Sequence, residues 1–210
     1  MGSCVIFCAG GFDGLIRPIG EQDYILAADG GYAHALSLEL TPDGVLGDFD
    51  SLGYVPENAK IFPVEKDDTD AMLAVRQGLS LGYEQFLLYG ALDGSRLDHT
   101  VANFQTLQYL ADRGARGYLI GKDHVVTVVK NSTLQFSAHA SGILSVFCLG
   151  ADAQGVTLTG LKYPLDNATL SPGFPLGVSN RFTGQEATVS VAAGSLLLIY
   201  DRKNGLPAGE

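Results

Sequence analysis

The chain has 210 residues, of which 46% are hydrophobic and 17% are charged. This is enough apolar material for one large globular unit or two smaller ones, and it excludes a disordered chain. The 13 Lys and Arg residues stand against 23 Asp and Glu residues, so the formal net charge is −10. A protein this acidic lacks the basic surface of a nucleic-acid or anionic-membrane binder, and we expect neither partner.

The beginning of the chain and the cysteines indicate a cellular compartment. The first basic residue is Arg17, and no apolar run approaches the ~20 residues of a membrane span, so we expect neither a signal peptide nor a membrane helix. Cys4 and Cys8 fall on one predicted strand, too far apart for a disulfide, and Cys148 makes the count odd. Free thiols are typical of a reducing compartment, so we expect a cytoplasmic protein.

The first 122 residues alternate short apolar runs with amphipathic stretches. The runs predicted as strands are 4–9, 24–28, 45–46, 61–64, 86–89 and 118–120. Because these runs are almost entirely apolar, they are typical of parallel strands covered on both faces. Apolar residues at helical spacing follow Asp70 and Asp98, and the second predicted helix closes at Gly114. The pattern predicts an open, mostly parallel α/β sheet with flanking helices.

The remaining residues have a different pattern. Short β-rich runs separated by Gly, Pro, Asn and Ser occupy 124–129, 143–149, 156–161, 187–191 and 196–200. No run has the length and periodicity of an amphipathic helix, so a small β-sandwich or barrel is predicted. The acidity is also uneven, since residues 1–122 hold 17 of the 23 acidic residues. We therefore expect an α/β domain at 1–122 and a β-rich domain at 123–210.

Ligands of open α/β sheets bind beyond the carboxyl ends of the strands, and the loops that follow the predicted strands are rich in Asp. Asp48 and Asp50 are two positions apart, which in an extended segment puts both carboxylates on the same side. Two such anions repel unless a cation joins them, and Mg²⁺ commonly uses one or two carboxylates with phosphate oxygens. A turn with Asp side-chain hydrogen bonds is the alternative, but the position at a strand end favours a metal.

A second acidic cluster, at 67–70, precedes a predicted helix. Thr69 or Asp68 suits the N-cap, and acidic residues in the first turn complement the helix dipole. The three carboxylates exceed what capping needs. We expect Asp70 to reach a metal, while Asp67 or Asp68 caps the helix.

The next predicted helix begins with Arg96, Asp98 and His99. The Arg96 guanidinium either clamps phosphate oxygens or forms a surface ion pair with Asp93. His99 is either a general base or a structural histidine. The sequence contains no G-x-G-x-x-G motif, and the segment 117–123 lacks the spacing and the hydroxyl of a P-loop. What remains is a set of carboxylates with an arginine, which is typical of metal-assisted phosphoryl-group chemistry.

Four short motifs now form a recognisable set. In chain order they are ADGG at 28–31, GDFDS at 47–51, DDTD at 67–70 and SRLDH at 95–99. This set resembles the thiamine pyrophosphokinase family, and GVSN at 177–180 is similar to the small-Ser-Asn thiamine motif of that family. The resemblance covers nearly the whole chain.

The resemblance implies ATP-dependent transfer of a pyrophosphoryl group to thiamine, which gives thiamine diphosphate and AMP by a Mg²⁺-assisted in-line displacement. It also implies a homodimer in which the α/β domain holds the nucleotide, and in which thiamine lies between that domain and the β-rich domain of the other subunit. Its implied catalytic residues are Asp48, Asp50, Asp70 and Asp98, the first three also holding the metal. Its implied nucleotide-binding residues are Asp29, Gly30, Arg96, Asp98 and His99. Its implied thiamine-binding residues are Lys66, Asp67, Thr69, Ser179 and Asn180.

The chain departs from the family pattern at three points. Ser95 stands where the family often has Gly, Lys66 stands where some members have Gln, and the chain has no Trp to stack on the pyrimidine, which leaves Phe182 or another aromatic residue. Two other functions remain open at this point. One is a diphosphokinase for another heterocyclic alcohol such as a hydroxymethylpterin, and the other is a sensor that binds thiamine or nucleotide without turnover.

Overall fold

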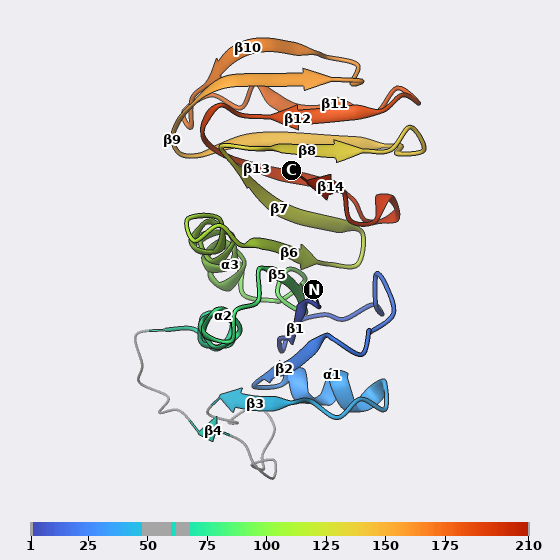
Figure 1. The fold of residues 1–210 in the computed structure, drawn as a ribbon, viewed down its shortest axis with the longest axis vertical. Helices are drawn as coiled ribbons and strands as arrows, with labels where there is room; N and C mark the ends of the chain where they lie inside the picture. The colour runs from blue at the N-terminus through green and yellow to red at the C-terminus, as the bar shows by residue number, and fades with distance from the viewer. Residues whose placement is uncertain (1, 48–59, 62–67, 210) are drawn as a thin grey trace. The chain divides into compact units, whose positions relative to one another are not determined.

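The computed structural model describes residues 2–47, 60–61 and 68–209. The chain has a mixed α/β fold and divides into two compact units, Met1–Lys122 and Asp123–Glu210 (Figure 1). The predicted site residues Asp48, Asp50, Lys66 and Asp67 lie outside the described residues.

The first unit is built on parallel strands in the order β6-β5-β1-β2-β3-β4. Their bounds are Cys4–Phe7 for β1, Tyr24–Ala28 for β2, Gly44–Gly47 for β3, Lys60–Ile61 for β4, Gln85–Tyr89 for β5 and Arg116–Ile120 for β6. Every residue of β1 is buried, as are the last four residues of β5 and of β6. The parallel pairing agrees with the continuous apolar runs, since both faces of such strands are covered.

Three helices in the described part of the first unit cover the parallel strands. They are α1 (Gly31–Ser37), α2 (Asp70–Ser80) and α3 (Leu97–Ala111). Figure 1 shows α2 and α3 on one side of the strands and α1 on the other. This follows from right-handed crossovers, because the connection from β2 to β3 runs across the sheet in the opposite direction to those from β4 to β5 and from β5 to β6.

The helix ends follow local capping rules. Thr69 is the N-cap of α2, since its hydroxyl accepts a hydrogen bond from the Met72 amide at 3.2 Å. Asp68, the other candidate, instead forms an ion pair with Arg76 at 2.5 Å. Helix α3 ends at Ala111, and Gly114 takes a φ of +74°, which turns the chain out of the helix.

The strand order places a crevice beyond the carboxyl end of β1. Strands β2 and β5 lie on either side of β1, and the chain leaves them toward opposite edges of the sheet. Such a switch in direction is where ligands bind in open α/β sheets. This crevice is bordered by the loops that follow β1, β2 and β5 and by the amino ends of α2 and α3.

The second unit contains antiparallel strands in the order β14-β8-β12-β9-β13-β7, with β10 and β11 also paired to β9. The bounds are His124–Lys130 for β7, Thr133–Phe136 for β8, Ile143–Thr159 for β9, Leu165–Leu170 for β10, Gly177–Arg181 for β11, Ala187–Ser190 for β12, Ala193–Asp201 for β13 and Ala208–Gly209 for β14. A single turn of 3₁₀ helix, Arg202–Asn204, is the helical segment among the described residues of this unit.

One prediction for this unit is wrong in detail. The sequence predicts separate strands at 143–149 and 156–161, but residues 143–159 form the single long strand β9. Gly150 and Gly155 have φ of +83° and +65°, so they bend the strand without ending it. The first part of β9 pairs with β13 and β11, and its last part pairs with β10 and β12.

The cysteines agree with a further expectation. Cys4, Cys8 and Cys148 are all free. Strand β1 ends at Phe7, so Cys8 begins the loop beyond it rather than sharing the strand with Cys4. Among the helices of the described part of the chain, none combines the length and the apolar character needed to cross a bilayer.

Candidate functional site

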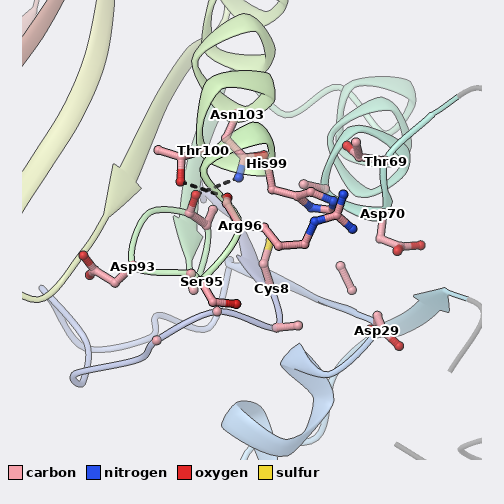
Figure 2. A pocket seen from close by; sticks show the side chains of 18 residues that line it. Cys8, Asp29, Thr69, Asp70, Asp93, Ser95, Arg96, His99, Thr100 and Asn103 are labelled. Carbon is pink, nitrogen blue, oxygen red and sulfur yellow. Dashed lines mark hydrogen bonds between the residues drawn. The ribbon is translucent and has the colours of Figure 1, made fainter. Parts of the chain in front are cut away.

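A cavity of about 430 Å³ opens at the carboxyl edge of the parallel strands in the first unit. It is lined by residues 8–11, 28–29, 69–71, 90–91, 93–96, 99, 100 and 103. Figure 2 shows its side chains coming from the loops after β1, β2 and β5 and from the amino ends of α2 and α3. These are the segments that the strand order brings to the crevice.

Two glycine-containing loops form one wall of the cavity. The Cys8 amide donates to the Tyr89 carbonyl and the Gly10 amide donates to the Gly90 carbonyl, both at 2.8 Å. A Cβ atom on Gly10 would lie 2.5 Å from the Gly90 carbonyl oxygen, and one on Gly90 would lie 2.2 Å from the Cys8 carbonyl oxygen. Only glycine allows the loops to approach so closely, and Gly90 also has a φ of +67°.

Asp29 lies between β2 and α1 in an uncommon backbone conformation. Its φ is +49°, a left-handed value that Asp adopts more readily than most residues with a side chain. The Asp29 amide donates to the Leu46 carbonyl at 2.8 Å, which fixes this turn against the next strand. Helix α1 then begins at Gly31, where a Cβ atom would lie 1.9 Å from the Phe7 carbonyl oxygen. This strained turn brings the Asp29 side chain to the cavity.

Asp70 is the first residue of α2 and lines the cavity beside its N-cap, Thr69. The negative charge of Asp70 affects the pKa of Cys8 on the neighbouring loop. Burial, and then the charge of Asp70, raise the pKa of the Cys8 thiol to about 12. The thiol therefore stays protonated near neutral pH and forms an uncharged part of the lining, not a nucleophile or a thiolate ligand.

Arg96 carries positive charge to the cavity from the start of α3. It is the N-cap residue but makes no side-chain cap. Its guanidinium instead forms a two-pronged ion pair with Asp98, at 2.5 Å and 3.2 Å. Hydrogen bonding to Arg96 lowers the pKa of Asp98, and the same bond raises the pKa of Arg96. The alternative pairing of Arg96 with Asp93 is therefore wrong, and Asp98 holds the guanidinium without lining the cavity itself.

Asn103 lines the cavity from the second turn of α3 and was not foreseen from the sequence. It is 7% exposed, and its Nδ2 donates to the Ala91 carbonyl at 2.6 Å, which anchors the loop after β5. A polar residue within the buried stripe of a predicted helix is the signal that would have identified it, because a buried amide requires a partner.

The structure thus brings a defined subset of the predicted residues together. Those that line the cavity are Asp29, Thr69, Asp70, Arg96 and His99. Gly30 is the N-cap of α1 and is not part of the lining. Among the residues that the structure describes, no group of three or more His, Cys, Asp or Glu side chains gathers in an arrangement suited to a metal ion. Gly10, Asp93 and Asn103 line the cavity without having been predicted.

The predicted thiamine motif of the second unit lies on β11. Asn180 is 3% exposed, and its carboxamide is held by the Tyr163 main chain, accepting from the amide at 2.9 Å and donating to the carbonyl at 2.7 Å. Ser179 is exposed and has a φ of +59°. Phe182, a candidate for stacking on a pyrimidine, packs its ring 5.2 Å from that of Phe136.

Comparisons with known proteins match both units. The family described as "Thiamin pyrophosphokinase, catalytic domain" matches residues 17–119, and "Thiamin pyrophosphokinase, vitamin B1 binding domain" matches residues 129–196. The thiamine pyrophosphokinase of Bacillus subtilis strain 168 is 27% identical over 188 residues, which are 85% of this chain and 87% of the relative.

Solved structures extend the likeness to the fold. The crystal structure of thiamine pyrophosphokinase from Bacillus subtilis has a TM-score of 0.82 at 24% identity and covers 95% of this chain and 98% of its own. That of thiamin pyrophosphokinase from Geobacillus thermodenitrificans has a TM-score of 0.76 at 28% identity, with coverages of 94% and 97%. At 24% identity, the likeness to the Bacillus subtilis crystal structure supports the fold alone. The sequence matches support the family.

Proposed function

Because the chain belongs to the thiamine pyrophosphokinase family, it is an enzyme with thiamine pyrophosphokinase activity, and we propose that the cavity of its first unit holds the ATP that supplies the transferred group. The observation that carries this assignment is the meeting of Asp29, Asp70 and Arg96 in one cavity at the switch point of the sheet. A cavity that presents both carboxylates and a guanidinium suits a triphosphate that carries a bound cation.

The donor chemistry of the cavity fits Mg²⁺. Its described side chains offer the carboxylate oxygens of Asp29 and Asp70, and the Cys8 thiol stays protonated, so hard oxygen ligands prevail. We propose that Asp70 holds the ion, together with Asp48 and Asp50 as the sequence predicts. When bound, Mg²⁺ would neutralise charge on the transferred group and on the departing AMP.

Arg96 is proposed to bind the phosphate oxygens of ATP. A guanidinium has five N–H donors in a planar fork, so it can keep its bond to Asp98 while it donates to a phosphate. Asp98 then acts by orienting Arg96, since it lies outside the cavity lining. His99 lines the cavity and remains either a general base for the thiamine hydroxyl or a structural residue. Alignment and charge stabilisation in the cavity account for most of the expected rate enhancement.

The second unit is proposed to bind thiamine. The region that matches the vitamin B1 binding domain, 129–196, includes the motif with Ser179 and Asn180. Ser179 is exposed and is proposed to contact thiamine, while Asn180 uses its carboxamide to hold the Tyr163 main chain in place. We also propose that the second unit is a sandwich or barrel. Lys66, Asp67 and Thr69 are proposed to contact thiamine as well. The enzyme is further proposed to be a homodimer located in the cytoplasm.

The comparisons favour thiamine over the alternatives. A hydroxymethylpterin diphosphokinase does not account for the match to a vitamin B1 binding domain, and a sensor without turnover does not account for the match to a catalytic domain. The acceptor assay is direct. The protein is incubated with Mg-ATP and either thiamine or 6-hydroxymethylpterin, and AMP and the diphosphate product are separated by chromatography, with product expected from thiamine alone.

The location of the nucleotide is tested by a crystal soaked with a non-hydrolysable ATP analogue, Mg²⁺ and thiamine. We expect the triphosphate between Asp70 and Arg96. Density for the triphosphate elsewhere would overturn the assignment of the cavity. In parallel, Asp48→Asn and Asp50→Asn are each expected to abolish turnover while the thermal unfolding temperature is kept, and normal turnover in both would refute their role as metal ligands.

A further inference from the structure

Asp93 lines the cavity, yet its carboxylate is bonded to the protein's own main chain. Its Oδ2 atom accepts a hydrogen bond from the Lys122 amide at 2.5 Å. In Figure 2 the Asp93 carboxylate points away from the side of the pocket where Asp29 and Asp70 lie. This carboxylate is neither one of the proposed Mg²⁺ ligands nor part of the proposed phosphate contact.

The main chain of Asp93 makes a second connection, to residues 10–11, which we call the glycine wall of the cavity. The Asp93 carbonyl accepts from the Gly11 amide at 3.1 Å, next to the bond from the Gly10 amide to the Gly90 carbonyl. Asp93 therefore joins three segments that are distant in sequence: the loop after β1, the loop after β5 and the segment just after β6, at Lys122.

Both connections depend on close approach of the chain. A Cβ atom on Gly121 would lie 2.5 Å from Asp93 Oδ2, and one on Gly11 would lie 3.0 Å from the Asp93 carbonyl oxygen. A side chain at position 121 would displace the Asp93 carboxylate from the place where it meets the Lys122 amide, and one at position 11 would press against the Asp93 main chain. The glycines on either side of Asp93 are consistent with a joint that requires its exact spacing.

We propose that Asp93 is a positioning residue that holds the glycine wall of the nucleotide cavity, residues 10–11, by anchoring the loop after β5 to the end of β6, and that it is not a ligand of the cation. This inference rests on the proposed function, since it takes the cavity to be the ATP site. The wall faces ATP, so a loosened wall weakens ATP binding more than it slows the chemical step.

Replacing Asp93 by Asn has a different effect on a positioning residue than on a metal ligand. A positioning role needs an acceptor for the Lys122 amide, which the Asn carboxamide oxygen provides. A metal ligand needs the negative charge, which Asn removes. Asp93→Asn therefore separates the roles, and Asp93→Ala removes both functions.

The test compares Asp93→Ala and Asp93→Asn by steady-state kinetics with ATP, thiamine and Mg²⁺ as separate variables. For Asp93→Ala we expect the KM for ATP to rise about tenfold with kcat changed less than about twofold. For Asp93→Asn we expect the KM for ATP within about threefold of the parent value. The Mg²⁺ concentration at half-maximal rate should be unchanged in both variants.

Three further variants make the outcome decisive. Gly121→Ala disrupts the joint from its other side and should show the same rise in the KM for ATP, which keeps the test available if Asp93→Ala does not fold. Glu84→Ala removes an exposed carboxylate at the opposite end of β5 and should match the parent. Arg96→Ala reports on the cavity itself and should raise the KM for ATP.

The results separate the positioning role of Asp93 from the assignment of the cavity to ATP. The positioning role is overturned if Asp93→Ala behaves like the parent, or if Asp93→Asn loses as much activity as Asp93→Ala and needs more Mg²⁺. If Arg96→Ala raises the KM for ATP while the Asp93 and Gly121 variants do not, the positioning role alone has failed. If substitutions at Arg96, Asp93 and Gly121 all leave the KM for ATP unchanged, the assignment of the cavity to ATP has failed as well.

Discussion

The two edges of the parallel sheet in the first unit use their carboxylates in opposite ways. At the amino edge, the Asp23 side chain is 4% exposed and accepts hydrogen bonds from the Ser3 and Gly20 amides and from Arg17. At the carboxyl edge, Asp29 and Asp70 line a cavity of about 430 Å³. A carboxylate enclosed by the chain stabilises the fold, whereas carboxylates that border a cavity are placed to meet a ligand.

This contrast predicts which property each substitution changes. A change at the amino edge should lower the free energy of unfolding and leave the kinetics intact. A change at the carboxyl edge should do the reverse, because sites arranged for a ligand contribute little to folding and some of them weaken it. Each of the following variants tests one side of this comparison.

The largest effect is expected for Asp70→Asn. The substitution keeps the size of the side chain but removes the charge that is proposed to hold Mg²⁺, so kcat should fall about a thousandfold. The thermal unfolding temperature should stay the same or rise slightly. The measurement is AMP release with saturating Mg-ATP and thiamine, together with a thermal melt. Glu84→Gln is the matched control, since it removes one exposed carboxylate away from the cavity.

Arg96→Ala is expected to have the next largest effect. Loss of the guanidinium should lower kcat/KM for ATP about a hundredfold, because one charge-assisted phosphate contact disappears. Arg96→Lys keeps the charge without the planar fork and should recover part of this loss. Equal activity of the Lys variant and the parent would show that the two-pronged bond to Asp98 has no role in orienting Arg96.

At the amino edge, acid should weaken the fold through Asp23. Burial disfavours the charged carboxyl, but hydrogen bonds from Arg17, Gly20 and Ser3 outweigh it and lower the pKa from 3.8 to about 2. The native state therefore binds fewer protons than the unfolded state, so the stabilisation is present above about pH 4 and is lost as the pH falls toward 2.

The measurement is urea unfolding of the parent and Asp23→Asn across this pH range. Between pH 5 and pH 2 the parent should lose about 2 kcal/mol more of its free energy of unfolding than the variant does. At pH 7 the kinetic constants of the folded variant should equal those of the parent. A changed KM for ATP would contradict the separation of the two edges.

The elements of the first unit were largely predictable because strand burial on both faces and helix capping are local signals. Thr69 is the N-cap that the sequence offered, and the apolar runs 4–9, 24–28 and 86–89 contain paired parallel strands. The division of β9 was mispredicted because Gly150 and Gly155 look like strand breaks in sequence, whereas pairing on both sides carries the strand through them. Tertiary pairing outweighed a local signal there.

Part of the charged lining of the cavity could be predicted from the sequence, and the hydrogen bonds that support the cavity could not. Asp29, Asp70 and Arg96 belong to motifs whose chemistry is visible in the sequence. Asp93 and Asn103 act through main-chain partners, Lys122 and Ala91, and those pairings follow only from the folded topology. No spacing in the sequence identifies which carbonyl or amide a side chain will reach.

The smallest effect is expected for His34, which supports the carboxyl edge from α1. Its Nε2 atom lies 2.8 Å from the Gly10 carbonyl, and its ring lies 5.2 Å from that of Phe12 in the same loop. His34→Ala removes one hydrogen bond to the glycine wall, so the KM for ATP should rise about fivefold while kcat is kept. His34→Gln keeps a donor and should restore the parent KM. Ser37→Ala removes a side-chain bond on the same helix, to the His34 carbonyl, and should leave the KM unchanged. If the Gln variant were as weak as the Ala variant, the imidazole would act through its packing on Phe12 and not through the Gly10 carbonyl.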